Sequence, residues 1–136
     1  MLNFINNVKT FKLFCDLADN GTLSVIEGPP HFPFKIERVF IVRGKRGSVR
    51  GEHAHKTCSQ FLTCSHGSIS VECTDGLDVV NFILDSPDLG LLIPPGIWAK
   101  QIYLKQNSIL TVLCDKIYDP LDYIRNYSDY KYYRNS

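Results

Sequence analysis

The chain has 136 residues, of which 44% are hydrophobic and 21% charged, and its formal net charge is +1. This length and composition fit one globular domain over residues 1–136 and argue against a disordered chain, while the near-zero charge argues against a general nucleic-acid binder. No apolar run is long enough for a membrane helix and the first residues do not resemble a secretory signal, so we expect a cytoplasmic protein without membrane contact.

Short strands separated by turn signals are predicted along most of the chain. Residues 10–14 and 22–27 are expected to pair as a hairpin, because Asn20-Gly21 between them is a strong turn dipeptide whose residues tolerate positive φ. The other predicted strands are 33–43, the segment with the paired histidines at 53 and 55, 60–64, 69–73, 78–84, 89–95 and 109–114. Such regular spacing of short strands and turns predicts an all-β sandwich or barrel.

The tail that follows the last strand, residues 118–133, holds six of the seven tyrosines. It could clamp a ligand, cover the end of the barrel or form a subunit contact. We favour packing against a partner subunit, because tyrosine offers a large amphipathic surface. A short helix is predicted from Pro120 to Asn126, with Asp119 as its N-cap.

The cysteines are odd in number and scattered, without a Cys-x-x-Cys pair. In a reducing compartment such residues act as small apolar fillers, so we expect free thiols rather than disulfides or a zinc site. The five residues are Cys15, Cys58, Cys64, Cys73 and Cys114.

Two of the four histidines, His53 and His55, are separated by a single alanine. In a strand they point to the same face, about 7 Å apart. Arg50 and Lys56 flank them and Gln60 follows, so the group could ligate a metal, exchange protons or bind an anion. The alternative is an ordinary polar strand face.

Arg38 is a second candidate, since it alternates with apolar residues in its predicted strand. It would point into an otherwise apolar cavity or lie near the mouth of that cavity. A guanidinium there matches a phosphate group, whereas the alternative is a surface arginine on an edge strand.

Two short motifs resemble those of the cupins, small β-barrels in which two histidines and a glutamate bind a metal. Residues 94–99 resemble the second motif, but Ala99 stands at its histidine position and Gln60 stands at the glutamate position of the first motif. Two imidazoles and an amide are too few donors for a stable divalent site, so we expect a jelly-roll barrel without metal or other cofactor. The first motif is matched in spacing by Gly47, His53, His55, Gln60 and Gly67.

From about Gly21 to Tyr132 the chain is similar to the WxcM-like family of sugar 3,4-ketoisomerases, which act on dTDP-4-keto-6-deoxyglucose. The similarity rests on Arg50-Gly51-x-His53-Ala54-His55 together with Tyr118-Asp119-x2-Asp122-Tyr123-Ile124-Arg125. It implies a metal-free dimeric cupin in which His53 and His55 move protons. The substrate or its nucleotide would be surrounded by Arg38, Arg50, Lys56, Gln60, Trp98, Tyr123 and Arg125.

The chain departs from that family at two positions. Relatives have a histidine directly after the tryptophan, where this chain has Ala99, and a tyrosine in the strand that here reads Phe40-Ile41. A 3,4-ketoisomerase is therefore the first hypothesis. A sugar-nucleotide epimerase-like cupin and a non-catalytic sugar-nucleotide-binding cupin are the alternatives.

Overall fold

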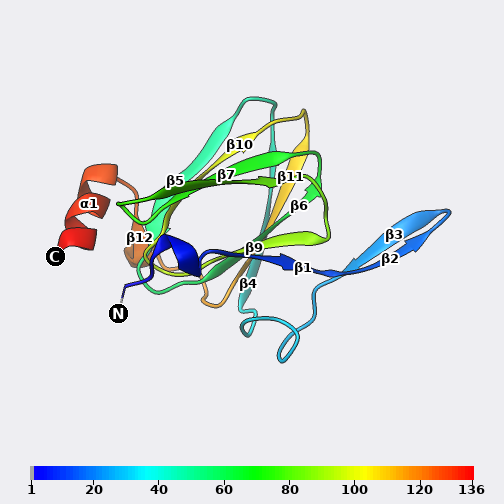
Figure 1. Cartoon of the computed structure of the whole chain (residues 1–136), viewed down its shortest axis with the longest axis horizontal. Helices are drawn as coiled ribbons and strands as arrows, with labels where there is room; N and C mark the ends of the chain where they lie inside the picture. The colour runs from blue at the N-terminus through cyan, green and yellow to red at the C-terminus, as the bar shows by residue number, and fades with distance from the viewer. Residues whose placement is uncertain (1) are drawn as a thin grey trace.

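The computed structural model describes residues 2–136 as two five-stranded antiparallel sheets that face one another (Figure 1). The strand order is β1-β9-β6-β11-β4 in the first sheet and β12-β5-β10-β7-β8 in the second. The first sheet comprises β1 (Lys9–Lys12), β4 (Arg38–Gly44), β6 (Gln60–His66), β9 (Leu89–Ile93) and β11 (Ser108–Cys114). The second comprises β5 (Val49–His55), β7 (Ile69–Thr74), β8 (Val79–Leu84), β10 (Trp98–Tyr103) and β12 (Tyr123–Ile124). The predicted all-β barrel is confirmed.

The core lies between the two sheets, because every second side chain of a strand points inward. In β11, for example, Leu110, Val112 and Cys114 are buried in the main cluster of apolar side chains. All five cysteines are unpaired and four of them are buried, which confirms the prediction of free thiols used as fillers.

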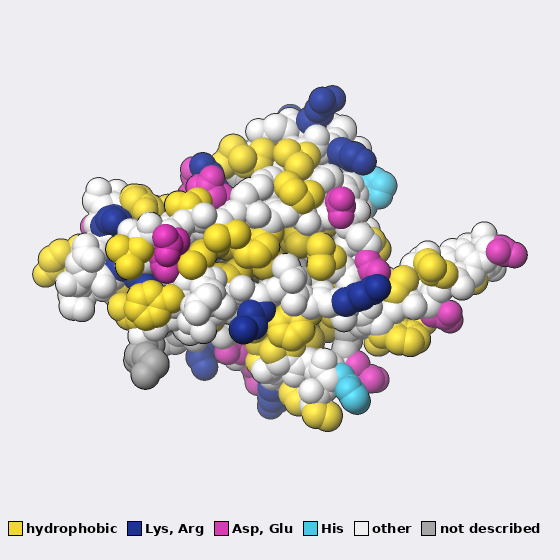
Figure 2. All heavy atoms as spheres, viewed as in Figure 1, with side chains coloured by type: hydrophobic (Ala, Val, Ile, Leu, Met, Phe, Trp, Pro, Cys, Tyr) yellow, Lys and Arg dark blue, Asp and Glu magenta, His cyan; other side chains and the backbone are white. Residues whose placement is uncertain are grey.

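The hairpin near the amino terminus is shifted from its prediction. Residues 9–12 pair with β9 as a strand of the barrel, and the hairpin consists of β2 (Phe14–Ala18) and β3 (Gly21–Val25). Its loop is Asp19-Asn20, and neither Asn20 nor Gly21 has a positive φ. The pair projects from the barrel as an arm with exposed apolar side chains at Phe14, Leu17 and Leu23 (Figures 1 and 2).

Two other strand predictions were wrong. Residues 98–103, for which no strand was predicted, form the central strand β10 of the second sheet. The segment 33–37 is irregular, so β4 begins only at Arg38.

The tail contains three short elements in place of one predicted helix. Asp119 does act as an N-cap, but for the 3-10 helix η2 (Pro120–Asp122), which is followed by β12 and then by α1 (Tyr127–Asn135). The remaining element is a 3-10 turn near the amino terminus, η1 (Ile5–Asn7). Among residues 2–136, no helix has the length and apolar character that a membrane crossing requires.

Helix α1 packs against its own barrel through Tyr130, which is fully buried. The Tyr130 hydroxyl lies 2.7 Å from the Gly96 carbonyl oxygen and 3.0 Å from that of Thr74. The Gly96 amide in turn donates to the His55 carbonyl at 2.7 Å, so this helix supports the segment beside the histidines. We had predicted that the tyrosine-rich tail packs against a partner subunit. At least Tyr130 of this tail packs against its own barrel instead.

Candidate active site

The two histidines lie side by side at the end of β5, with ring centroids 5.0 Å apart. Each imidazole also contacts Tyr123 of β12, at 5.1 Å from His53 and 4.3 Å from His55 between ring centroids. This contact follows from the strand pairing, since Tyr123 lies directly opposite His55. The structure thus brings together both histidines and one tyrosine of the tail.

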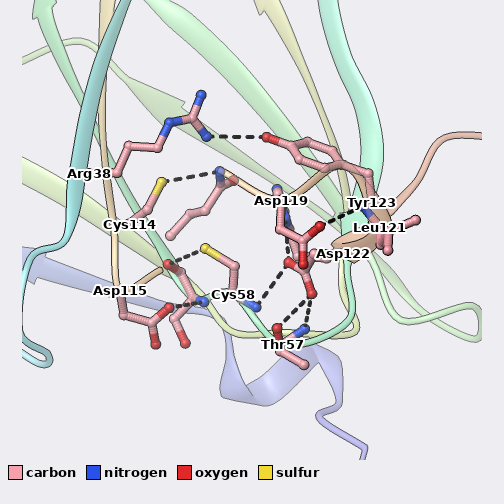
Figure 3. Close-up of polar contacts among 12 residues, drawn as sticks. Arg38, Thr57, Cys58, Cys114, Asp115, Asp119, Leu121, Asp122 and Tyr123 are labelled. Atoms are coloured by element: carbon pink, nitrogen blue, oxygen red, sulfur yellow. Dashed lines mark hydrogen bonds and ion pairs between the residues drawn. The ribbon is translucent and has the colours of Figure 1, made fainter. Parts of the chain in front are cut away.

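Asp122 is the closest charged neighbour of the pair, and sequence reasoning missed it. Its Oδ2 lies 3.0 Å from His55 Nδ1, and its Oδ1 accepts from the backbone amide and the hydroxyl of Thr57, both at 2.7 Å. The Cys58 amide donates to Oδ2 at 3.2 Å. Figure 3 shows this carboxylate held against the segment that follows β5. The second aspartate of the Tyr-Asp-x2-Asp-Tyr motif was the available signal.

Burial and hydrogen bonding together determine the protonation of His53, His55 and Asp122. It lowers the pKa of His53 from 6.5 to about 4, with the neighbouring His55 adding to the effect. Burial also lowers the pKa of His55, although Asp122 opposes that change. For Asp122, burial acts to raise the pKa, but hydrogen bonds from Thr57 and His55 outweigh it and hold the pKa below its ordinary value. Near pH 7 the arrangement therefore has neutral imidazoles beside an ionised carboxylate.

Two arginines flank Tyr123. Arg38 Nη1 donates to the Tyr123 hydroxyl at 3.4 Å (Figure 3). Its guanidinium also lies over the rings of Phe40 and Tyr118. The Arg125 guanidinium lies 4.1 Å from the centre of the Tyr123 ring. Arg38 thus lies half-buried beside the histidine cluster. This position agrees with the prediction that Arg38 lies near the mouth of the cavity.

A cavity of about 300 Å³ opens next to this cluster, between β12 and α1. It combines two basic side chains, three tyrosines and one carboxylate, that of Asp129. The basic and aromatic groups suit an anion attached to a planar ring, held away from Asp129. The lining residues are Lys56, Tyr123, Ile124, Arg125, Asp129, Tyr132, Tyr133 and Ser136.

Comparison with known proteins decides the family. Residues 6–135 match the family described as FdtA, WxcM-like, C-terminal. The chain belongs to this WxcM-like family.

Relatives in the family share most of this chain's length. The chain is 37% identical over 129 residues to the TDP-4-oxo-6-deoxy-alpha-D-glucose-3,4-oxoisomerase of Aneurinibacillus thermoaerophilus, covering 94% of this chain and 91% of that protein. It superposes with a TM-score of 0.91 on QdtA, a sugar 3,4-ketoisomerase from Thermoanaerobacterium thermosaccharolyticum in complex with TDP, at 32% identity over 96% of both chains. WlaRB, the TDP-quinovose 3,4-ketoisomerase of Campylobacter jejuni, gives 0.87 at 32% identity over 94% of this chain and 99% of its own.

An epimerase resembles this WxcM-like chain only in fold. The rmlC epimerase of Mycobacterium tuberculosis superposes with a TM-score of 0.79 but is 17% identical, over 89% of this chain and 69% of its own. The epimerase-like alternative therefore has support from architecture alone.

Arg50 is brought to the face of the histidines by a β-bulge. His53 lies opposite Ala99 of β10, whereas Arg50 lies opposite Gln101, so one extra residue, Glu52, separates the two pairings. Glu52 has a φ of 58°, the left-handed backbone that such an insertion requires. In a regular strand, Arg50 and His53 would point to opposite faces. Here both share the face of Ala99 and Gln101.

Two other predicted residues, Gln60 and Trp98, make their contacts with side chains other than the histidines. Gln60 is buried on the opposite sheet, with its Nε2 3.7 Å from Cys114 Sγ. Trp98 packs with Ala54, Ile124 and Tyr130 on the outer side of its strand, and the structure does not bring it together with the histidines. A direct substrate contact by Trp98 stays a prediction that this placement does not favour.

The two family departures leave apolar groups in the barrel. Ala99 is buried opposite His53, and Phe40 lies under the Arg38 guanidinium, so neither can exchange a proton. Among the described residues, His55, Cys58 and Asp122 each place one donor atom within 4.8 Å of the others. The carboxylate in that group already accepts from His55, Thr57 and Cys58, so its oxygens have no free position suited to a cation.

Proposed function

We propose that this protein is a 3,4-ketoisomerase that converts TDP-4-keto-6-deoxyglucose into a TDP-3-keto-6-deoxyhexose. The observation that carries the proposal is the pair of neutral imidazoles, His53 and His55, in a chain 37% identical to an oxoisomerase of that substrate. A mutant of the related QdtA has been solved in complex with TDP-4-keto-6-deoxyglucose, which supports the same substrate here.

The reaction needs only proton transfers. A 4-keto sugar has an acidic proton on C3, because the electron pair left behind delocalises into the carbonyl as an enediolate. A base removes that proton, an acid returns one to C4, and the proton of the C3 hydroxyl moves to the oxygen on C4. The sugar is oxidised at C3 and reduced at C4, so the balance requires no external electron acceptor.

His53 is the candidate base for C3. It is the more exposed of the two imidazoles, since His53 is half-buried whereas His55 is 7% exposed. His53 Nδ1 and His55 Nε2 are both buried without a hydrogen-bond partner among the described residues. With a pKa of about 4, His53 is uncharged near pH 7, so its lone pair is free to take a proton, while burial makes it a weaker base than an ordinary histidine. His55 would then transfer the hydroxyl proton between the two oxygens, a role that requires it to accept and release in turn.

The nucleotide is assigned to the basic and aromatic side of the site. Arg38 and Arg125 flank Tyr123 and would hold the diphosphate by charge-assisted hydrogen bonds, as expected for guanidinium groups. The adjoining 300 Å³ cavity with Lys56 would receive the nucleoside end. Arg50 would keep the potential inside the barrel positive, which stabilises the enediolate.

We also propose a homodimer and a cytoplasmic location. The exposed apolar side chains of the β2–β3 arm suit a contact with a second subunit, which supports a homodimer. A cytoplasmic location stays our prediction.

An NMR time course in deuterated water tests the function. With TDP-4-keto-6-deoxyglucose as substrate, we expect a 3-keto product that carries deuterium at C4. Deuterium at C3 with the keto group still at C4 would select the epimerase alternative. TDP-sugar binding without exchange or turnover would select the non-catalytic alternative.

A further inference from the structure

We infer that Asp122 is a positioning residue for the proposed isomerisation: its carboxylate determines which ring nitrogen of His55 carries the proton. The inference rests on the proposed function for its catalytic consequence. Its structural content, the tautomer of His55, can be measured without any substrate.

Hydrogen bonds to both the side chain and the main chain of Asp122 fix the position of its carboxylate. The side chain accepts four hydrogen bonds, of which Thr57 and Cys58 supply three. The main chain adds a bond from the Lys56 amide to the Asp122 carbonyl at 2.9 Å, and the next residue, Tyr123, pairs with His55 across the ladder. Asp122 therefore cannot move relative to β5 without breaking several of these contacts.

This geometry leaves one arrangement for the proton. The ionised carboxylate only accepts hydrogen bonds, so His55 Nδ1, 3.0 Å from Oδ2, must carry the hydrogen. The other nitrogen, Nε2, then has a free lone pair. It is buried and has no hydrogen-bond partner among the described residues, so its lone pair is free to accept a proton.

Asp122 also acts after His55 has accepted a proton. The ring becomes an imidazolium that is largely removed from solvent, with a side chain 8% exposed beside a carboxylate that is 10% exposed. The negative charge 3.0 Å away stabilises this cation, which an amide of the same shape cannot do. Loss of the charge would therefore affect the chemical step more than substrate binding.

The direct test is the tautomer of His55 in the wild-type protein, read from long-range ¹H–¹⁵N NMR spectra at pH 7. We expect the proton on Nδ1. A proton on Nε2 would overturn the inference, whether or not the protein isomerises the sugar. The expected tautomer in a protein without turnover would leave the inference intact and refute the proposed function instead.

The kinetic test is Asp122→Asn, which keeps the size of the side chain but places a donor where an acceptor stood. We expect kcat to fall about 10²- to 10⁴-fold, the range for a lost acid or base, with little change in KM or in affinity for TDP. The acid limb of the kcat profile should move to lower pH, because the His55 cation loses its partner. An unchanged kcat would contradict the inference.

Asp115→Asn is the matched control. Asp115 Oδ1 accepts from the Ser59 amide at 2.8 Å in the neighbouring segment (Figure 3) and forms no hydrogen bond or ion pair with either histidine. This variant should lose a comparable backbone hydrogen bond while keeping kcat and the His55 tautomer. Thr57→Ala, which removes one hydroxyl donor but leaves the charge of Asp122, should lower kcat by less than about tenfold. Equal losses in all three variants would indicate a purely structural role for Asp122.

Discussion

The burial of His53 predicts a specific dependence of stability on pH. In the folded protein its pKa is about 4, against 6.5 for an unperturbed histidine. Between these two values the unfolded chain binds a proton that the folded protein does not, so the free energy of unfolding rises with pH in this window. The contribution is fully present above pH 6.5 and is lost as the pH falls toward 4.

The magnitude follows from the two pKa values. Each tenfold difference in proton affinity corresponds to about 1.4 kcal/mol, so His53 should destabilise the fold by about 2 kcal/mol at pH 5 and by about 3 kcal/mol at pH 4, relative to pH 7. This is a large part of the 5–15 kcal/mol, roughly, that separates native from unfolded domains.

Urea denaturation of wild-type protein and His53→Asn at pH 7, 6, 5 and 4 measures the effect. The carboxylates titrate in both proteins, so the difference between them reports His53 together with its coupling to His55. We expect the wild type to lose about 2 kcal/mol more than the variant by pH 5. His66→Asn, a change at an exposed histidine, should follow the wild type. Parallel curves for wild type and His53→Asn would refute the assigned burial of this imidazole.

Three further predictions concern activity and packing. His53→Asn and His55→Asn should each lower turnover about 10²- to 10⁴-fold while TDP affinity, measured by calorimetry, changes little; near-wild-type turnover in both would remove the proposed mechanism. Tyr130→Phe removes the hydroxyl that bonds the Gly96 and Thr74 carbonyls and should cost about 1–3 kcal/mol in urea denaturation, so an unchanged midpoint would show that these contacts contribute nothing. Gly90→Ala would place a methyl group in the ring of Phe61 and should lower stability by about 1–3 kcal/mol, whereas full stability would mean that this ring can move aside.

The sequence predicted those parts of the site that depend on local spacing. His53 and His55 are two positions apart in a strand, so their shared face follows from the alternation of side chains, and the structure has them in contact. The residues that surround the two histidines come from other strands. Which strands pair cannot be read from the spacing of residues along the sequence. The proximity of Asp122 to His55 joins residues 67 positions apart, and it depends on the pairing of β12 with β5.

Other errors have similarly physical causes. Trp98 stands next to Ala99 in sequence, and for that reason it points to the opposite face, where α1 covers it. The tail helix was placed too early because Asp119 and Pro120 are good start signals. Tyr123 and Ile124 instead add a strand to the edge of a sheet, which separates the 3-10 turn from α1.

The bulge at Glu52 makes the number of residues, rather than their chemical type, decide what faces the inside of the barrel. A chain with Glu52 deleted would have Arg50 and His53 two positions apart, so a regular ladder would still place both on the face of Ala99 and Gln101. A change that straightened the strand while keeping Glu52 would instead turn Arg50 to the opposite face, and the barrel would lose a positive charge although the arginine itself remained. In comparisons of this segment between proteins, a relative that lacks one residue here can therefore keep its arginine on the same face.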